Sequence, residues 1–108
     1  MNASLVVILI SLKFTAAGVS QHQLAMPSGA SITYINEDAR PHQVYSPDCG
    51  ALSSLLLSPG ESFVARAPPG PRSCHFQDLL QPSESSYFGA VDVAPAPVDD
   101  WVSANITP

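Results

Sequence analysis

From Gly18 onward, a proline or a glycine occurs within every dozen residues, and that spacing limits what the chain can fold into. The sequence holds 11 prolines and 6 glycines in 108 residues. Both residues favour turns, and proline also removes a backbone donor. The segments between them are short, several alternate apolar and polar side chains, and no helical periodicity competes. We therefore expect an all-β fold, a Greek-key β-sandwich of about seven to eight strands.

The clearest of these strands is SITYIN at residues 31–36. Ile32 and Tyr34 fall on one face of an extended chain, as the period of two requires. The polar turn 36–41 ends the pattern because Asx side chains bond their own backbone and proline cannot donate to a ladder. His42 follows the turn and opens a second extended segment. The other expected strands are residues 5–12, 23–26, 43–45, 61–67, 72–78 and 88–93.

The length bounds the domain organisation. A chain of 108 residues is long enough for one sandwiched core and too short for two. Pro95 and Pro97 stand in alternate positions, which cannot lie inside a sheet. We expect one domain over residues 1–94, followed by a Pro-rich C-terminal tail or linker over residues 95–108.

The apolar run at residues 5–12 has two interpretations. It has the length of a signal-peptide core, but no positive charge precedes it and Lys13 follows it, which inverts the usual order. It is also shorter than the ~20 apolar residues of a transmembrane helix. We favour a buried first strand that ends at residues 13–15, and we expect no membrane span.

Charge and motif content exclude several classes of function. Four basic residues against nine acidic ones leave a net charge of -5, which cannot neutralise a phosphate backbone, so we expect no nucleic-acid binding. The sequence holds no Gly-rich phosphate loop, no His-Glu-x-x-His motif and no nucleophile elbow. We therefore expect a protein that is not an enzyme and whose partner is another protein or an adjacent domain.

Four motifs together resemble the plastocyanin and azurin group, the cupredoxins, over residues 5–93. They are Leu24...Pro27-x-Gly29, Ile32-x-Tyr34-x-Asn36-x-Asp38-x-x-Pro41-His42-x-Val44, Leu57-x-Pro59-Gly60-x-x-Phe63 and Gly89-x-Val91-x-Val93. The resemblance implies a Greek-key sandwich whose type 1 copper centre transfers electrons. Such a centre needs a thiolate, two imidazoles and usually a weak axial thioether.

The resemblance assigns the first copper-binding histidine to His42. The remaining ligands, a cysteine, a histidine and a methionine, are expected in the loop before the last strand. When that loop is anchored on Phe76 and Pro82, Asp78 stands in place of the cysteine and Gln81 in place of the second histidine. Tyr87 or Phe88 stands where the methionine is expected.

We therefore expect a vestigial site at His42, Asp78 and Gln81, with type 1 copper lost and no cofactor. The domain would then serve as a structural or interaction module of an exported protein, secreted or periplasmic. A copper-binding electron carrier with an altered site, using His42, Cys74 and His75, is the alternative. Neighbouring residues of a regular strand point to opposite faces, which disfavours that ligand set.

Several smaller expectations concern the same residues. His42 could bond the 36–41 turn, and Asp78 could pair with His42, cap loop amides or join Gln81 in a weak site for a hard metal. His22 and His75 are expected at the surface. Two cysteines fit either one disulfide or two free thiols. We favour a disulfide between Cys49 and Cys74, which requires Cα atoms within ~7 Å.

Overall fold

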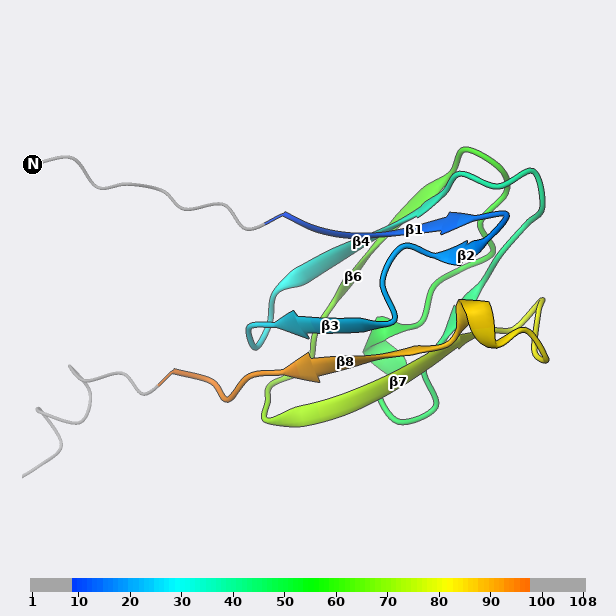
Figure 1. The fold of residues 1–108 in the computed structure, drawn as a ribbon. Coiled ribbons are helices and arrows are strands. Elements are labelled where there is room, and N and C mark those ends of the chain that lie inside the picture. The colour runs from blue at the N-terminus through cyan, green and yellow to red at the C-terminus, as the bar shows by residue number, and fades with distance from the viewer. Residues whose placement is uncertain (1–8, 98–108) are drawn as a thin grey trace, which may run out of the picture.

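Two four-stranded sheets packed face to face make up the computed structural model, which describes residues 9–97 (Figure 1). The predicted all-β sandwich is therefore confirmed, with eight strands. They are β1 (Ile10–Thr15), β2 (Gly18–Val19), β3 (Gln23–Met26), β4 (Ser31–Asn36), β5 (Val44–Tyr45), β6 (Ser62–Arg66), β7 (Arg72–Asp78) and β8 (Gly89–Val93).

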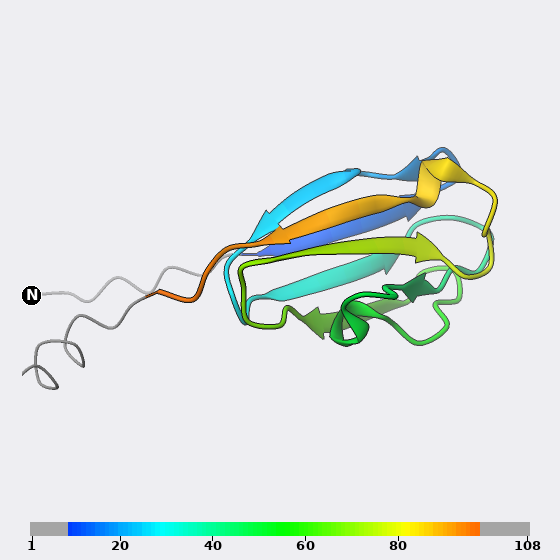
Figure 2. The same ribbon diagram turned by 90° about the horizontal axis from the view of Figure 1, so that it is seen from below.

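The chain crosses between the two sheets. One sheet has the order β2-β1-β4-β6 and the other the order β3-β8-β7-β5, and Figure 2 shows the two layers from below. The pairs β1 with β4 and β3 with β8 are parallel, while the other strand pairs are antiparallel. Strands distant in sequence are thus neighbours, so the end of β4 and the end of β7 can contribute to one site.

Alternation along each strand builds the core. The strand predicted at 31–36 is β4, and its residues Ile32, Tyr34 and Asn36 are all buried. The inward side chains of the other strands complete one apolar cluster. The members of that cluster on the longer strands are Leu12, Phe14, Leu24, Met26, Ala65, Cys74, Phe76, Val91 and Val93.

The N-terminal prediction needs correction. Residues 13–15 were expected to end the first strand, but they lie inside β1, which starts at Ile10. Lys13 points to solvent while Phe14 is fully buried, so the lysine continues the alternation and does not break it. Residues 16–21, which were not among the expected strands, contain the short strand β2. Residues 5–8, the first half of the run 5–12 that had a signal-peptide interpretation, lie outside the described residues.

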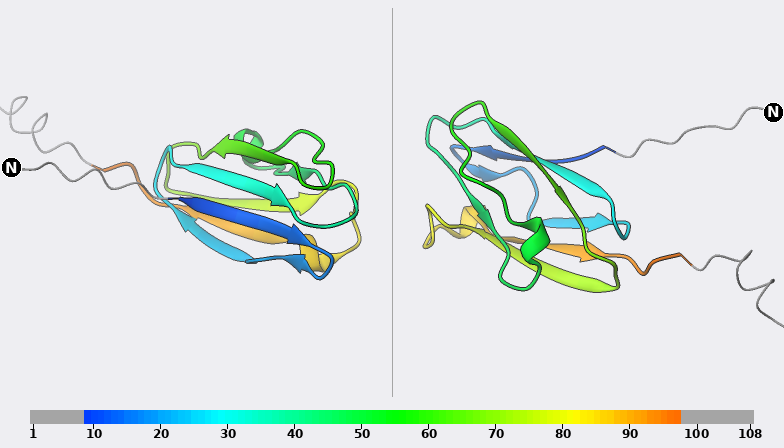
Figure 3. Two further views of the ribbon diagram at one scale, coloured as in Figure 1. Left: turned by 90° about the horizontal axis from the view of Figure 1, so that it is seen from above. Right: turned by 180° about the vertical axis from the view of Figure 1, so that it is seen from behind.

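Two short 3-10 helices interrupt the sandwich. The first, η1 (Gly50–Leu52), lies beside β6 and β5 (Figure 3) and begins the segment 50–57 between β5 and β6. The same segment ends in an isolated bridge between His42 and Leu57, so its other end is extended. The second helix, η2 (Ser85–Tyr87), immediately precedes β8.

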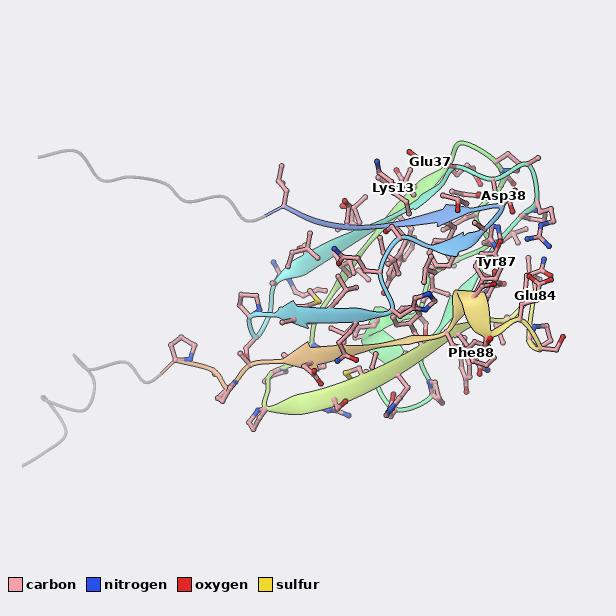
Figure 4. All side chains as sticks on the ribbon, in the orientation of Figure 1. Lys13, Glu37, Asp38, Glu84, Tyr87 and Phe88 are labelled. Atoms are coloured by element: carbon pink, nitrogen blue, oxygen red, sulfur yellow. A yellow bond between two sulfur atoms is a disulfide. The ribbon has the colours of Figure 1, made fainter. Side chains whose placement is uncertain are left out.

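The two ends of the sandwich carry different parts of the chain. The start of β1 and the end of β8 both lie at one end, whereas Asp38, Glu84 and Tyr87 gather at the opposite end (Figures 1 and 4). β8 ends at Val93, and Pro95 forms a bridge with Gly70. Residues 98–108 of the predicted tail lie outside the described range. Within residues 9–97, no helix is long and apolar enough to cross a membrane.

Candidate functional site

His42 is fully buried at the end of the sandwich that also carries η2. Its backbone pairs with Leu57 in both directions, with the His42 N–H donating at 3.0 Å and the Leu57 N–H donating at 2.7 Å. The imidazole lies beside the rings of Phe14 and Tyr87, with centroid separations of 5.4 and 4.7 Å. The first residue of the candidate site is therefore fixed in place and shielded from solvent.

Each ring nitrogen of His42 faces its own carboxylate. Nδ1 contacts Oδ2 of Asp78, and Nε2 lies 2.8 Å from Oδ2 of Asp38. Asp78 is fully buried and Asp38 is 8% exposed. The two carboxylates occupy both of the positions through which an imidazole binds a metal.

The turn after β4 brings Asp38 to the imidazole, and Asn36 organises that turn. The Asn36 side-chain oxygen accepts the Asp38 N–H at 2.8 Å, an Asx turn. Its amide group donates to the carbonyls of Arg40 at 2.8 Å and of Leu57 at 2.9 Å. One buried side chain thus joins the turn to the segment that pairs with His42.

Arg40 extends the network toward η2. Its Nε donates to Oδ2 of Asp38 at 3.1 Å, and a terminal nitrogen donates to the Tyr87 hydroxyl at 2.7 Å. The Tyr87 hydroxyl in turn donates to the Thr15 carbonyl at 2.6 Å. The hydrogen bond from His42, assisted by that from Arg40, holds the pKa of Asp38 below its ordinary value. Burial raises the pKa of Tyr87.

Asp78 ends β7 and makes both kinds of contact considered for it. Its Oδ2 pairs with His42, while its Oδ1 accepts the backbone N–H of Gln43 at 3.1 Å and of Leu80 at 2.9 Å. The carboxylate therefore caps the loop amides and orients the imidazole at the same time.

Gln81 and the aromatic pair after it are placed differently. Gln81 bonds through its backbone, donating to the Asp78 carbonyl at 3.2 Å and accepting from Glu84 at 3.1 Å. Within residues 9–97, no hydrogen bond joins the Gln81 side chain to His42 or Asp78. Of the two residues at the expected methionine position, Tyr87 is the one that contacts the imidazole.

The predicted disulfide is confirmed. Cys49 and Cys74 are bonded, with Cα atoms 5.5 Å apart, and both are buried. His75 points the other way, where its Nδ1 lies 2.8 Å from Oδ2 of Asp48 and its side chain is 69% exposed. The structure thus brings Cys74 to Cys49 and does not bring His42, Cys74 and His75 to one place. His22 is exposed, as predicted.

The donor set does not fit type 1 copper. The cysteine sulfurs within residues 9–97 are in the disulfide, and both nitrogens of the buried imidazole face carboxylates. In the described part of the chain, no three His, Cys, Asp or Glu side chains gather as a group able to hold a metal ion. Oxygen donors without a thiolate lack the soft ligand that this centre requires.

Sequence reasoning did not assign a role in the site to Asp38, Arg40 or Phe14. Asp38 stands four residues before His42 and two after Asn36, a spacing that a tight turn can fold back onto the histidine. That spacing was the available signal for Asp38. No local signal marks Phe14, because it reaches the imidazole only through the pairing of β1 with β4.

Comparison with known proteins gives structural likeness only. No protein-family model matches the chain, and no curated protein matches its sequence. Among solved structures, a purple cupredoxin from Nitrosopumilus maritimus is 21% identical, with a TM-score of 0.64 over 79% of this chain and 99% of that one. An oxidised amicyanin mutant is 18% identical, with a TM-score of 0.66 over 80% and 82%.

A larger protein contains the same fold as one of its parts. The Cu-containing nitrite reductase from Thermus scotoductus SA-01 is 16% identical and has a TM-score of 0.68. The match covers 90% of this chain but only 24% of the reductase. The arrangement therefore occurs both in small proteins and as part of a longer one.

Proposed function

This chain has the cupredoxin fold, and from that premise we propose that it is a cupredoxin-like domain that has lost type 1 copper and serves as a structural or interaction module. A fold can persist after its site is lost because the core and the ligand loop use different residues. Here the inward residues of the strands build the core, while Asp78 stands at the end of β7 and Gln81 in the loop that follows.

One observation carries the proposal: both ring nitrogens of His42 face buried carboxylates. An imidazole binds a metal through a free lone pair, so copper would have to displace Asp38 or Asp78. Displacement would leave a carboxylate buried beside apolar rings without its partner, which is costly. The disulfide at Cys74 removes the soft donor as well.

Two further features support a module of an exported protein. A buried disulfide is typical of oxidising compartments, which supports secretion or a periplasmic location. The leucines 55, 56, 79 and 80 are exposed, two on the loop before the Leu57 bridge and two after β7. Exposed apolar side chains of this kind suit contact with a protein partner or an adjacent domain. The function is binding and not catalysis.

Titration of the purified protein with Cu(II) tests the loss of copper. We expect no intense charge-transfer band near about 600 nm, where thiolate-to-copper transitions of type 1 centres fall. The matched control is the same titration after reduction of the disulfide, which frees the thiol of Cys74. An intense band in the oxidised protein would overturn the proposal.

Calorimetry addresses the remaining metal hypothesis, a site for hard or borderline metals at His42 and Asp78. Wild type and His42→Ala are titrated side by side with Zn(II) and Mn(II). We expect no metal heat that depends on His42, because that imidazole is already paired on both sides. Heat seen in wild type and absent from the variant would establish the metal site.

A further inference from the structure

We propose that His42 is held as an imidazolium and is the resident cation of this site, balancing the buried carboxylates of Asp38 and Asp78. The proposal rests on the proposed function, because it supplies from the protein itself the positive charge that the family resemblance would assign to a metal. The charge state follows from the hydrogen-bond partners of each carboxylate in turn.

Asp38 is ionised because its partners are donors. Its Oδ2 accepts from the Nε of Arg40 at 3.1 Å, and its Oδ1 accepts the Ala39 N–H at 2.8 Å. The guanidinium of arginine has hydrogens to give and no lone pair to accept with. The third partner, Nε2 of His42 at 2.8 Å from Oδ2, must therefore also carry a hydrogen.

Asp78 is ionised for the same reason. Its Oδ1 accepts two backbone N–H groups, from Gln43 at 3.1 Å and from Leu80 at 2.9 Å. Hydrogen bonds to the charged form of a carboxylate favour that form. The remaining oxygen faces Nδ1 of His42, so this contact is a hydrogen bond when Nδ1 carries a hydrogen. Hydrogens on both nitrogens make the ring a cation.

The surroundings suit a cation. Phe14 and Tyr87 place their rings beside the imidazole, with centroids 5.4 and 4.7 Å away, within the ≈ 6 Å range in which aromatic rings attract cations. The hydroxyl of Tyr87 is directed to Arg40 and to the Thr15 carbonyl and does not compete for the imidazole. Two carboxylates, one imidazolium and the Arg40 guanidinium sum to no net charge, and the partly exposed Glu84, 3.5 Å from Arg40, adds one negative charge at the edge of the cluster.

The rival arrangement is a neutral imidazole beside a protonated Asp78, with the carboxyl hydrogen shared toward Nδ1. The two arrangements have the same heavy-atom positions, but they differ in the number of hydrogens on the ring. Side-chain ¹⁵N NMR reads that number directly. An ordinary histidine has a pKa of about 6.5 and is mainly neutral at about pH 8, so the measurement is made there.

We expect one histidine to show two protonated ring nitrogens at about pH 8, with slowly exchanging N–H hydrogens. The matched controls are the exposed His22 and His75, identified by loss of their signals in His22→Gln and His75→Gln. A neutral His42 at that pH, with only one protonated nitrogen, would overturn the proposal. The spectrum is recorded with a chelator present, so that no metal ion can occupy a ring nitrogen during the measurement.

Chemical rescue gives a second, independent measurement. His42→Ala leaves a cavity between two carboxylates, and added imidazole should raise its Tm at acidic pH, where free imidazole is a cation, more than at alkaline pH. The opposite pH preference would contradict the proposal, and the NMR measurement stands if the variant does not fold. A copper band with a doubly protonated His42 refutes the proposed function alone. A neutral His42 without a copper band refutes the imidazolium alone.

Discussion

Cys74 and His75 are adjacent in sequence, yet their side chains lie on opposite faces of β7, one bonded to Cys49 inside the sandwich and the other paired with Asp48 at its surface. The separation follows from the two-residue period of a strand. It prevents a Cys-His pair from serving one metal, and it also makes the two bonds separable by experiment.

The first prediction concerns the interior bond. Cys49→Ala combined with Cys74→Ala removes a crosslink between residues 25 positions apart in the chain. The chain-entropy model assigns such a loop about 3 kcal/mol of stability. Urea denaturation should show a loss of that order, and wild type under reducing conditions should approach the double variant. Equal stability of oxidised and reduced wild type would contradict this.

The second prediction concerns the surface bond and its pH dependence. The hydrogen bond from His75 lowers the pKa of Asp48 from its ordinary 3.8 to about 2. Because the folded pKa is the lower one, the carboxylate contributes stability above about pH 4 and loses it as pH falls toward 2. Asp48→Asn should therefore lower the Tm at neutral pH and match wild type near about pH 2.

The size of that effect is limited by exposure. Both partners are partly solvated, so the difference at neutral pH should stay within about 1 kcal/mol. Asp38 also has a lowered pKa and remains in the variant. Its carboxylate likewise contributes stability that is lost as the pH falls. The Asp48→Asn variant should therefore still lose stability in acid, but along a shallower curve than wild type.

The third prediction tests the hydroxyl that links η2 to β1. Tyr87→Phe keeps the ring beside His42 and Phe14 but leaves the Thr15 carbonyl without its donor. The hydrogen bond is part-buried, and losing one such bond costs about 0.5–1.5 kcal/mol, which urea denaturation measures. Tyr45→Phe, on an exposed tyrosine of β5, is the control and should change stability little. Similar losses in both variants would contradict a specific role for Tyr87.

The fourth prediction separates Asp78 from Gln81, the two oxygen-bearing residues at the positions where the cupredoxin resemblance expects copper ligands. Asp78→Asn removes the buried partner of His42 and should cost about 3–5 kcal/mol, as breaking a buried pair does. Gln81→Ala should cost little, because Gln81 bonds through its backbone. Circular dichroism during urea denaturation compares the two. A larger loss of stability in Gln81→Ala than in Asp78→Asn would contradict this prediction.

The fifth prediction concerns the close approach of β2 to η2. Gly18 has a φ of +134°, and a Cβ there would meet the Ser86 carbonyl oxygen at 2.5 Å. Gly18→Ala should therefore destabilise the domain by about 1–3 kcal/mol. Gly50→Ala is the matched control, since nothing lies within 4 Å of a Cβ at that position. Thermal unfolding of both variants provides the comparison.

The strands could be predicted from sequence where local alternation decided them. Residues 31–36 became β4 and residues 72–78 became β7 with the expected bounds. The end of β1 was misplaced, because Lys13 was interpreted as a stop signal, although a solvent-facing position tolerates lysine and the strand runs on to Thr15. β2 was missed because two residues paired with a neighbour carry no periodic pattern of their own.

The site was predictable in part. His42 and Asp78 could be paired from the family resemblance, because the turn after β4 and the end of β7 belong to motifs with fixed spacing. The second carboxylate could not be assigned, since Asp38 reaches Nε2 only through the Asx turn that Asn36 closes. Long-range packing of Phe14 and Tyr87 around the imidazole depends on sheet pairing, which no local pattern encodes.

The placement of both described ends at one pole of the sandwich has a practical consequence. The start of β1 and the end of β8 lie opposite the pole that carries Asp38 and Tyr87 (Figures 1 and 4). A biosensor chip or a fused reporter attached through either end would hold the domain with its imidazole-bearing pole turned outward. Immobilised in this way, the protein displays the loops after β4 and β7 to whatever ligand flows past.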